Sequence, residues 1–296
     1  MALVEFVKGV AGGDFDNDGR PDLYVSVRGG ANHLFRNVGP VAAGARRSDQ
    51  AGCVSWATRF IDVAANAGVT EPFNSFPTWF FDYDNDGWED IFVSGYLLSD
   101  PGDIASDYLG LPHGAELPRL YRNRGDGTFE DATRPARLSR LLLAMGSNYG
   151  DLDNDGVQDV YHVVGGAFEA DHFRNALFEN PGHGHHWIAL KLEGVRSNRA
   201  AIGARIKVVA RTPGGERAIY KTVSSGGSFG SSPLRQEIGL GDAAAIERVE
   251  ILWPSGGPSQ ILSGLALDRH YLVDEGGAGA TPIPLRRFRL GGSRDE

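Results

Sequence analysis

Three short loops in the sequence carry enough carboxylate groups, at a fixed spacing, to bind a metal ion. Each has the pattern D-x-D-x-D-G-x-x-D, which offers side-chain oxygens at positions 1, 3, 5 and 9 and a backbone carbonyl at position 7. Calcium prefers six to eight such oxygen ligands, and the glycine at position 6 lets the chain turn sharply around an ion. The sequence therefore predicts three Ca²⁺ sites. The predicted ligands are Asp14, Asp16, Asp18, Arg20 and Asp22 in the first loop, Asp82, Asp84, Asp86, Trp88 and Asp90 in the second, and Asp151, Asp153, Asp155, Val157 and Asp159 in the third.

Two other structures produce similar patterns. An EF-hand needs a bidentate glutamate at position 12, but that position holds Val25, Val93 and His162 and a β-type pattern follows directly. EF-hands are therefore excluded. Asp, Asn and Gly also favour turns without any metal, which would explain one isolated copy. Three copies at nearly constant spacing favour metal sites, and the clustered carboxylates favour a structural role for the ion.

The loops belong to a repeat that predicts short β-strands. Each loop is followed by a segment rich in β-branched and aromatic residues, and weaker Leu-aromatic-x-Asn repeats fall between the loops, at residues 34–37, 120–123 and 177–180. Several short strands per repeat are typical of a propeller blade. We therefore expect an all-β fold with partial β-propeller blades over residues 1–182.

Two segments differ from this repeat. Residues 97–118 form an acidic insertion with glycine and proline. The i, i+3, i+4, i+7 spacing of Leu138, Leu141, Leu142 and Met145 predicts a short helix facing the core.

Residues 183–275 also read as short strands and predict a small β-sandwich or barrel-like domain. The expected strands cover residues 187–192, 204–211, 217–223, 235–238, 246–253 and 270–273. Residues 276–296 are rich in Gly, Pro and Arg, which predicts a flexible basic tail.

Composition excludes several classes of function. The formal net charge of −9 argues against a nucleic-acid partner, because phosphate binding needs a basic surface. The longest apolar runs are too short to insert into a membrane. Cys53 is the only cysteine, so an intrachain disulfide and a cysteine-based zinc site are excluded. Residues 1–12 do not resemble a secretory signal, so the protein is intracellular or its true N-terminus lies further upstream.

Residues 226–230 match the G-x-S-x-G pattern of a nucleophile elbow, with Asp268 and His270 following in hydrolase order. That elbow needs a strand-to-helix turn over a parallel sheet, whereas this stretch joins predicted β-strands. A glycine-rich β-turn is the better prediction, and no catalytic residue is predicted.

Two further groups have a structural and a functional explanation. His183, His185 and His186 could bind a transition metal, but no nearby carboxylate or cysteine completes a ligand set, which favours a linker. Trp253, in the sequence Trp-Pro-Ser-Gly, is predicted to be buried at a strand end. The alternative is an exposed Trp253 that stacks on a sugar ring.

These motifs resemble a known combination of families. The three loops look like the FG-GAP or VCBS repeats of Ca²⁺-binding β-propellers. Residues 186–192, 197–205, 225–228, 239–241 and 253–256 look like the ASPIC/UnbV domain. The combination is similar to the cartilage acidic protein family over about residues 9–275. The resemblance implies a calcium-dependent propeller that is extracellular, on the cell surface or periplasmic.

The chain departs from the family in its number of repeats, because family members usually carry more repeats and an export signal ahead of these. Three blades cannot close a ring. We expect an N-terminally truncated chain, or an open edge covered by the C-terminal domain or paired with another chain.

The leading functional expectation is a non-catalytic binding or adhesion module that recognises a glycan or protein ligand. The second is an enzyme of a natural-product or cell-envelope pathway with its active site in the propeller channel. The third is a structural surface or matrix component that assembles through its open blade edge.

Overall fold

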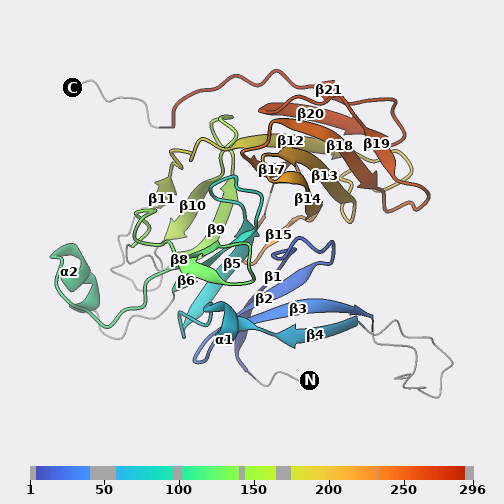
Figure 1. Ribbon diagram of the computed structural model, residues 1–296. Coiled ribbons are helices and arrows are strands. Elements are labelled where there is room, and N and C mark those ends of the chain that lie inside the picture. The colour runs from blue at the N-terminus through green and yellow to red at the C-terminus, as the bar shows by residue number, and fades with distance from the viewer. Residues whose placement is uncertain are drawn as a thin grey trace, which may run out of the picture.

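The computed structural model describes residues 5–40, 58–95, 102–139, 144–164, 175–231 and 233–290. Nearly all of its regular structure is β, in five sheets of three or four strands (Figure 1), as expected of a propeller-type fold. The predicted all-β propeller fold is thereby confirmed. Within the described ranges, no helix has both the length and the apolar character needed to cross a membrane.

The three sequence repeats each form one antiparallel sheet, here called blades 1, 2 and 3. Blade 1 contains β1 (Val7–Gly13), β2 (Asp22–Val27), β3 (His33–Pro40) and β4 (Thr58–Asp62), in that order. Blade 2 contains β5 (Ser75–Phe81), β6 (Asp90–Gly95), β7 (Arg119–Asn123) and β8 (Phe129–Asp131). Blade 3 contains β9 (Ala144–Gly150), β10 (Asp159–Val164) and β11 (Ala176–Phe178). Each aspartate loop joins the first strand of its blade to the second.

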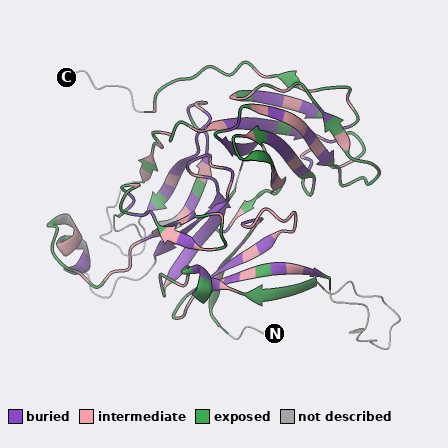
Figure 2. Ribbon diagram, in the orientation of Figure 1, coloured by how far each residue is buried: buried purple, intermediate pink, exposed green. Residues whose placement is uncertain are grey.

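Apolar side chains on both faces of blade 2 hold the three blades together. Phe80 packs with Tyr24 of blade 1 in one hydrophobic cluster. Its neighbour Trp79 packs with Val160 of blade 3 in another. Successive residues of a strand point to opposite faces of the sheet, so adjacent residues serve different cores. Figure 2 shows these inner strands buried and the outer strand β4 exposed along its length.

The C-terminal part forms two four-stranded sheets that enclose one hydrophobic core, which includes Leu190, Val208 and Ile251. One sheet has the order β17 (Gln236–Gly241), β12 (His186–Glu193), β20 (Arg269–Asp274) and β21 (Thr281–Pro282). The other has the order β14 (Gly215–Thr222), β13 (Arg205–Thr212), β18 (Ala245–Leu252) and β19 (Gln260–Leu262). The six strands expected from the sequence correspond to β12, β13, β14, β17, β18 and β20.

Four short elements complete the described structure. They are α1 (Ala64–Ala67), α2 (Gly102–Tyr108), β15 (Gly226–Gly227) and β16 (Gly230–Ser231). The predicted helix over residues 138–145 is not helical at either described end: Leu138 lies outside the helices and strands, and Met145 belongs to β9, where pairing with β10 sets the backbone. Leu138 is buried, whereas Leu141, Leu142 and Cys53 lie outside the described residues.

Strands β15 and β16 form a hairpin, here called the hub hairpin. It lies in the hub, the region where the first strands of the three blades meet. Ser228 N donates a hydrogen bond to the Thr78 carbonyl of β5 at 3.1 Å, and Ser147 N of β9 donates one to the Phe229 carbonyl at 3.3 Å. A Cβ added to Gly9 of β1 would lie 2.2 Å from Ser228 Oγ. The hairpin therefore contacts the first strand of every blade.

Candidate metal centres

The three aspartate loops share a backbone conformation that curls the chain back on itself. The asparagine at position 4 is left-handed in each, with φ of 52° at Asn17, 58° at Asn85 and 62° at Asn154. The glycine at position 6 has φ of 83°, 84° and 90°. Asparagine and glycine tolerate this region better than other residues. The N-D-G part of the motif therefore fixes the turn.

The aspartates at positions 1 and 5 stabilise the turn through backbone amides. In the second loop, Asp82 Oδ1 accepts a hydrogen bond from Asp86 N at 3.0 Å and Oδ2 accepts one from Gly87 N at 2.8 Å. Asp86 Oδ1 accepts a hydrogen bond from Trp88 N at 2.9 Å. The first and third loops repeat these bonds. The position-1 carboxylate accepts a hydrogen bond from the position-5 amide, at 3.0 and 2.9 Å, and the position-5 carboxylate accepts one from the position-7 amide, at 2.9 Å in both loops. One sequence pattern thus gives the same local geometry three times.

The aspartate at position 9 is fixed by two amides, one from its own loop and one from the third strand region of its blade. Asp22 accepts hydrogen bonds from Phe15 N at 3.2 Å and Asn37 N at 2.7 Å. Asp90 and Asp159 make the same pair of bonds, and their third-strand partners are Asn123 N at 2.7 Å and Asn180 N at 2.8 Å. These three asparagines end the weaker Leu-aromatic-x-Asn repeats, a signal that did not by itself reveal their contact with the loops.

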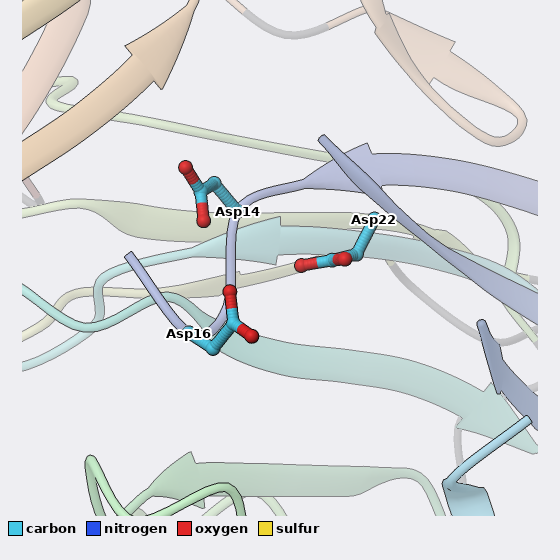
Figure 3. A group of neighbouring side chains, drawn as sticks. All are labelled: Asp14, Asp16 and Asp22. Atoms are coloured by element: carbon cyan, nitrogen blue, oxygen red, sulfur yellow. The ribbon is translucent and has the colours of Figure 1, made fainter. Parts of the chain in front are cut away.

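Three of the four carboxylates converge in each loop. One oxygen from each member of a group lies within 4.8 Å of the other two; the groups are Asp14, Asp16 and Asp22, then Asp82, Asp84 and Asp86, then Asp151, Asp153 and Asp155. Figure 3 shows the first group, in which Asp16 and Asp22 point toward each other from opposite arms of the loop. Asp18 contacts Arg20 instead. Each cluster could hold a metal ion.

Burial makes these carboxylates costly to ionise. Desolvation, reinforced by the nearby Glu89, raises the pKa of Asp14 to about 7. Desolvation also raises the pKa of Asp22 to about 8 and that of Asp159 to about 6. The pKa values of Asp82 and Asp90 are raised by burial and by neighbouring carboxylates. A bound cation would remove this penalty, because an opposite charge favours the ionised form.

Arginines already neutralise part of this charge. Arg36 Nε lies 2.6 Å from Asp16 Oδ2, and Arg122 Nε lies 2.7 Å from Asp84 Oδ2. Asp16 Oδ1 is buried and, like Oδ2, accepts no hydrogen bond from the described residues. A cation would satisfy this oxygen, so the donor set fits a hard metal ion. The carbonyl ligands expected from Arg20, Trp88 and Val157 stay a prediction.

Asparagine side chains connect each loop to the next. Asn17 Nδ2 donates a hydrogen bond to the Gly87 carbonyl at 2.8 Å, and Asn85 Nδ2 donates one to the Gly156 carbonyl at 2.9 Å. Asn154 Nδ2 donates to the Arg286 carbonyl at 3.1 Å. Residues 281–288, within the segment expected to be a flexible tail, thus pair with β20 and contact the third loop. At the third loop, residues 281–288 thus occupy the position that the following loop occupies at the first and second loops.

The C-terminal sheets also bind the loops. Arg217 Nη1 donates a hydrogen bond to the Asp86 carbonyl at 2.6 Å, and Arg235 Nη2 donates one to the Asp151 carbonyl at 3.1 Å. Lys221 pairs with Glu89, which lies at position 8 of the second loop. The candidate metal centres therefore lie where the blades meet the C-terminal part.

Comparison with protein families agrees with this architecture. Residues 82–162 match the FG-GAP-like repeat, and residues 194–280 match the ASPIC and UnbV family. The chain is an FG-GAP propeller with a UnbV domain. A search of curated proteins found no match. The FG-GAP match contains the second and third loops, whereas the first loop lies before it. A propeller joined to a UnbV domain indicates a binding module in general.

The other candidates from the sequence have structural positions in this propeller. Ser228 lies in the turn of the hub hairpin, as the glycine-rich β-turn interpretation expects. Asp268 and His270 each contact another partner. Asp268 Oδ2 lies 2.8 Å from His186 Nδ1, and His270 Nε2 lies 3.3 Å from Asp151 Oδ2. Within the described part of the chain, the linker histidines at 183, 185 and 186 join no group of three metal-binding side chains.

The Trp253 side chain is buried, and its Nε1 donates a hydrogen bond to Gln260 Oε1 at 2.8 Å. The alternative of an exposed Trp253 that stacks on a sugar is therefore wrong. The ring fills the core of the UnbV domain, where burial of its large apolar area stabilises the fold.

Proposed function

We propose that the protein is a calcium-dependent binding module that acts outside the cytoplasm and recognises a glycan or a protein. The observation that carries this proposal is the threefold convergence of buried carboxylates with raised pKa values. Calcium is favoured over magnesium because the loops supply flexible oxygen ligands, whereas magnesium requires near-ideal octahedral geometry. The ion would have a structural role, since the first two loops contact the loop of the next blade and each of the three loops contacts the C-terminal part.

The proposed location follows from the expected affinity. Loops of this kind bind calcium with dissociation constants of about 10⁻⁴–10⁻³ M in extracellular modules. Such sites fill in extracellular or periplasmic calcium and stay empty at cytosolic concentrations. FG-GAP-repeat proteins are often extracellular or periplasmic, which supports this assignment.

The hub hairpin supports binding rather than catalysis in the propeller channel. It contacts the first strand of every blade, and a cavity of about 170 Å³ lies next to it. The charged groups that line this cavity include Lys221, Glu89, Arg235 and Glu237, and they form ion pairs with one another. A ligand of glycan or peptide size would instead bind on the surface loops, which a rigid propeller presents side by side.

A thermal and urea unfolding comparison tests the calcium part of the proposal. Calcium at ~2 mM should raise the free energy of unfolding by about 2–5 kcal/mol over EGTA, if three sites of the affinity above load only in the folded state. Asp16→Ala, Asp84→Ala and Asp153→Ala should each reduce the gain. Asp242→Ala, an exposed aspartate outside the loops, should leave it intact. A well-folded protein with equal stability in calcium and EGTA would show that the loops are ordinary turns.

A further inference from the structure

In the described part of the chain, blade 3 has no counterpart of the outer strand that blades 1 and 2 possess. Strands β4 and β8 are the fourth strands of their sheets, whereas the third sheet has the order β11-β10-β9 and ends at β11. Among the described residues, no strand pairs with the outer edge of β11. Such an edge presents unpaired backbone amides and carbonyls and can accept another strand.

The two existing fourth strands define what a third one would look like. Both contain the pattern Phe-x-Asp, at residues 60–62 and 129–131. They pair in the same register: Asn37 with Phe60, Arg36 with Ile61 and Phe35 with Asp62; then Asn123 with Phe129, Arg122 with Glu130 and Tyr121 with Asp131. The amide after each Asp donates a hydrogen bond to the Leu34 or Leu120 carbonyl, at 2.8 Å in both cases. The matching positions in blade 3 are Leu177, Phe178, Glu179 and Asn180.

The phenylalanine of the pattern is buried where the preceding blade supplies an aromatic partner. Phe129 packs against Phe15 of the first loop, with ring centroids 5.9 Å apart, and is 7 % exposed. Phe60 belongs to blade 1, where no earlier loop is present in the described chain, and is 39 % exposed. The residue of the second loop that corresponds to Phe15 is Tyr83. A strand added to β11 would therefore place its phenylalanine next to Tyr83.

A groove lies at this place. It has a volume of about 650 Å³, and its walls include Tyr83, Phe81, Leu120, Phe178 and Asn180. The walls thus combine apolar side chains of blade 2 with the edge strand of blade 3. The groove has the position, the size and the apolar character needed to accept an aromatic side chain.

Charge specifies the middle residue of the missing strand. In blade 2, Arg122 faces Glu130 across the strand pair, with an N–O distance of 3.3 Å. Blade 3 has the opposite sign, because Glu179 stands where blades 1 and 2 have Arg36 and Arg122. A basic residue opposite Glu179 would restore the ion pair, and an acidic one would repel it.

We propose that the edge of β11 binds an extended segment of a partner protein with the sequence Phe-(Lys/Arg)-Asp followed by a small residue. The segment adds antiparallel to β11 as the fourth strand of blade 3, and its phenylalanine enters the groove beside Tyr83. Residues 1–296 contain neither Phe-Lys-Asp nor Phe-Arg-Asp, so a second copy of this stretch does not supply the proposed segment.

Two labelled peptides test the proposal by fluorescence polarisation on the full chain in calcium buffer. One has the sequence of residues 127–133, Gly-Thr-Phe-Glu-Asp-Ala-Thr, and the other has lysine in place of the glutamate. The lysine peptide should bind about 2- to 30-fold more tightly, the range expected when a cross-strand repulsion becomes an attraction. Glu179→Lys in the protein should reverse this preference. Glu216→Lys, the same charge change at an exposed site, should not.

Different outcomes test the groove at β11 and the sequence of the proposed segment separately. Loss of binding when alanine replaces the peptide phenylalanine would support the groove. No binding of the lysine peptide at millimolar concentration would overturn the proposal, as would equal affinity for both peptides in wild type and Glu179→Lys. Melting curves of the variants in calcium and EGTA report folding and calcium binding separately, so a failure of the metal sites would be recognised as such.

Discussion

Lys221 of the UnbV domain reaches into the hub and pairs with Glu89 of the second loop, and the two side chains are 12 % and 10 % exposed. Glu89 Oε2 also accepts a hydrogen bond from Asp14 N at 2.6 Å, so this carboxylate joins the first loop, the second loop and the UnbV domain. Burial alone would lower the pKa of Lys221, but Glu89 and neighbouring acidic groups raise it above its ordinary value. Lys221 is therefore charged at neutral pH.

The Lys221→Met variant keeps the length of the side chain and leaves Glu89 buried without its cation. Removal of one partner of a buried ion pair costs about 3–5 kcal/mol, because the remaining charge stays desolvated. Lys191→Met is the matched control, since the Lys191 side chain is 53 % exposed and pairs with Glu193 at the surface. Its cost should stay below about 1 kcal/mol.

Urea unfolding of both variants, of Glu89→Gln and of the double variant Lys221→Met/Glu89→Gln measures the effect. The double variant should be more stable than the sum of the single changes predicts, because it removes the unpaired charge as well as the pair. A cost of Lys221→Met below about 1 kcal/mol, or additivity within about 0.5 kcal/mol, would refute the buried pair and the hub contact that it represents.

Two further predictions concern single residues of blade 3. Burial lowers the pKa of His162 to about 4, so from pH 6.5 down to pH 4 the unfolded chain binds the proton first and stability falls by about 3 kcal/mol. His162→Val, which installs the residue found at Val25 and Val93, should remove this part of the acid sensitivity in calcium buffer; an unchanged pH slope would contradict the burial. Gly156→Ala should lower the free energy of unfolding by at least about 1–3 kcal/mol more than Gly257→Ala does. Both glycines have positive φ, so the backbone strain is matched. A Cβ at residue 156 would lie 1.8 Å from the Trp187 ring, whereas a Cβ at residue 257 meets open space. Equal losses in urea unfolding would show that Trp187 does not pack on the third loop.

The sequence predicted the parts of the site whose geometry is local. The turn needs a left-handed Asn and Gly at fixed positions, and its hydrogen bonds join residues within the nine-residue motif, such as Asp14 and Gly19. Strand alternation also indicated the blades and six of the C-terminal strands, because one buried face imposes a period of two. These features do not depend on the rest of the chain.

The sequence did not reveal contacts whose spacing differs between repeats. Asn37 lies 15 residues after its aspartate, Asn123 lies 33 after and Asn180 lies 21 after, so no fixed spacing marks them as partners. The hub hairpin is equally non-local. It fits because Gly9 and Gly230 have no side chain where another backbone or side chain approaches, and a Cβ on Gly230 would lie 2.0 Å from the Ser147 carbonyl.

The convergence of carboxylates in the aspartate loops and the docking of the UnbV domain depend on the same loop conformation. The curl that brings Asp82, Asp84 and Asp86 together also orients the Asp86 carbonyl toward Arg217 and the Asn85 carbonyl toward Gly241 N, at 2.8 Å. Any cation that stabilises this curl stabilises the domain contact, and by linkage the docked domain raises the affinity of the loops for the cation. The coupling extends from the first loop to the third, because Asn17 and Asn85 each donate a hydrogen bond to the following loop. Three candidate metal sites can in this way act as one support for the propeller.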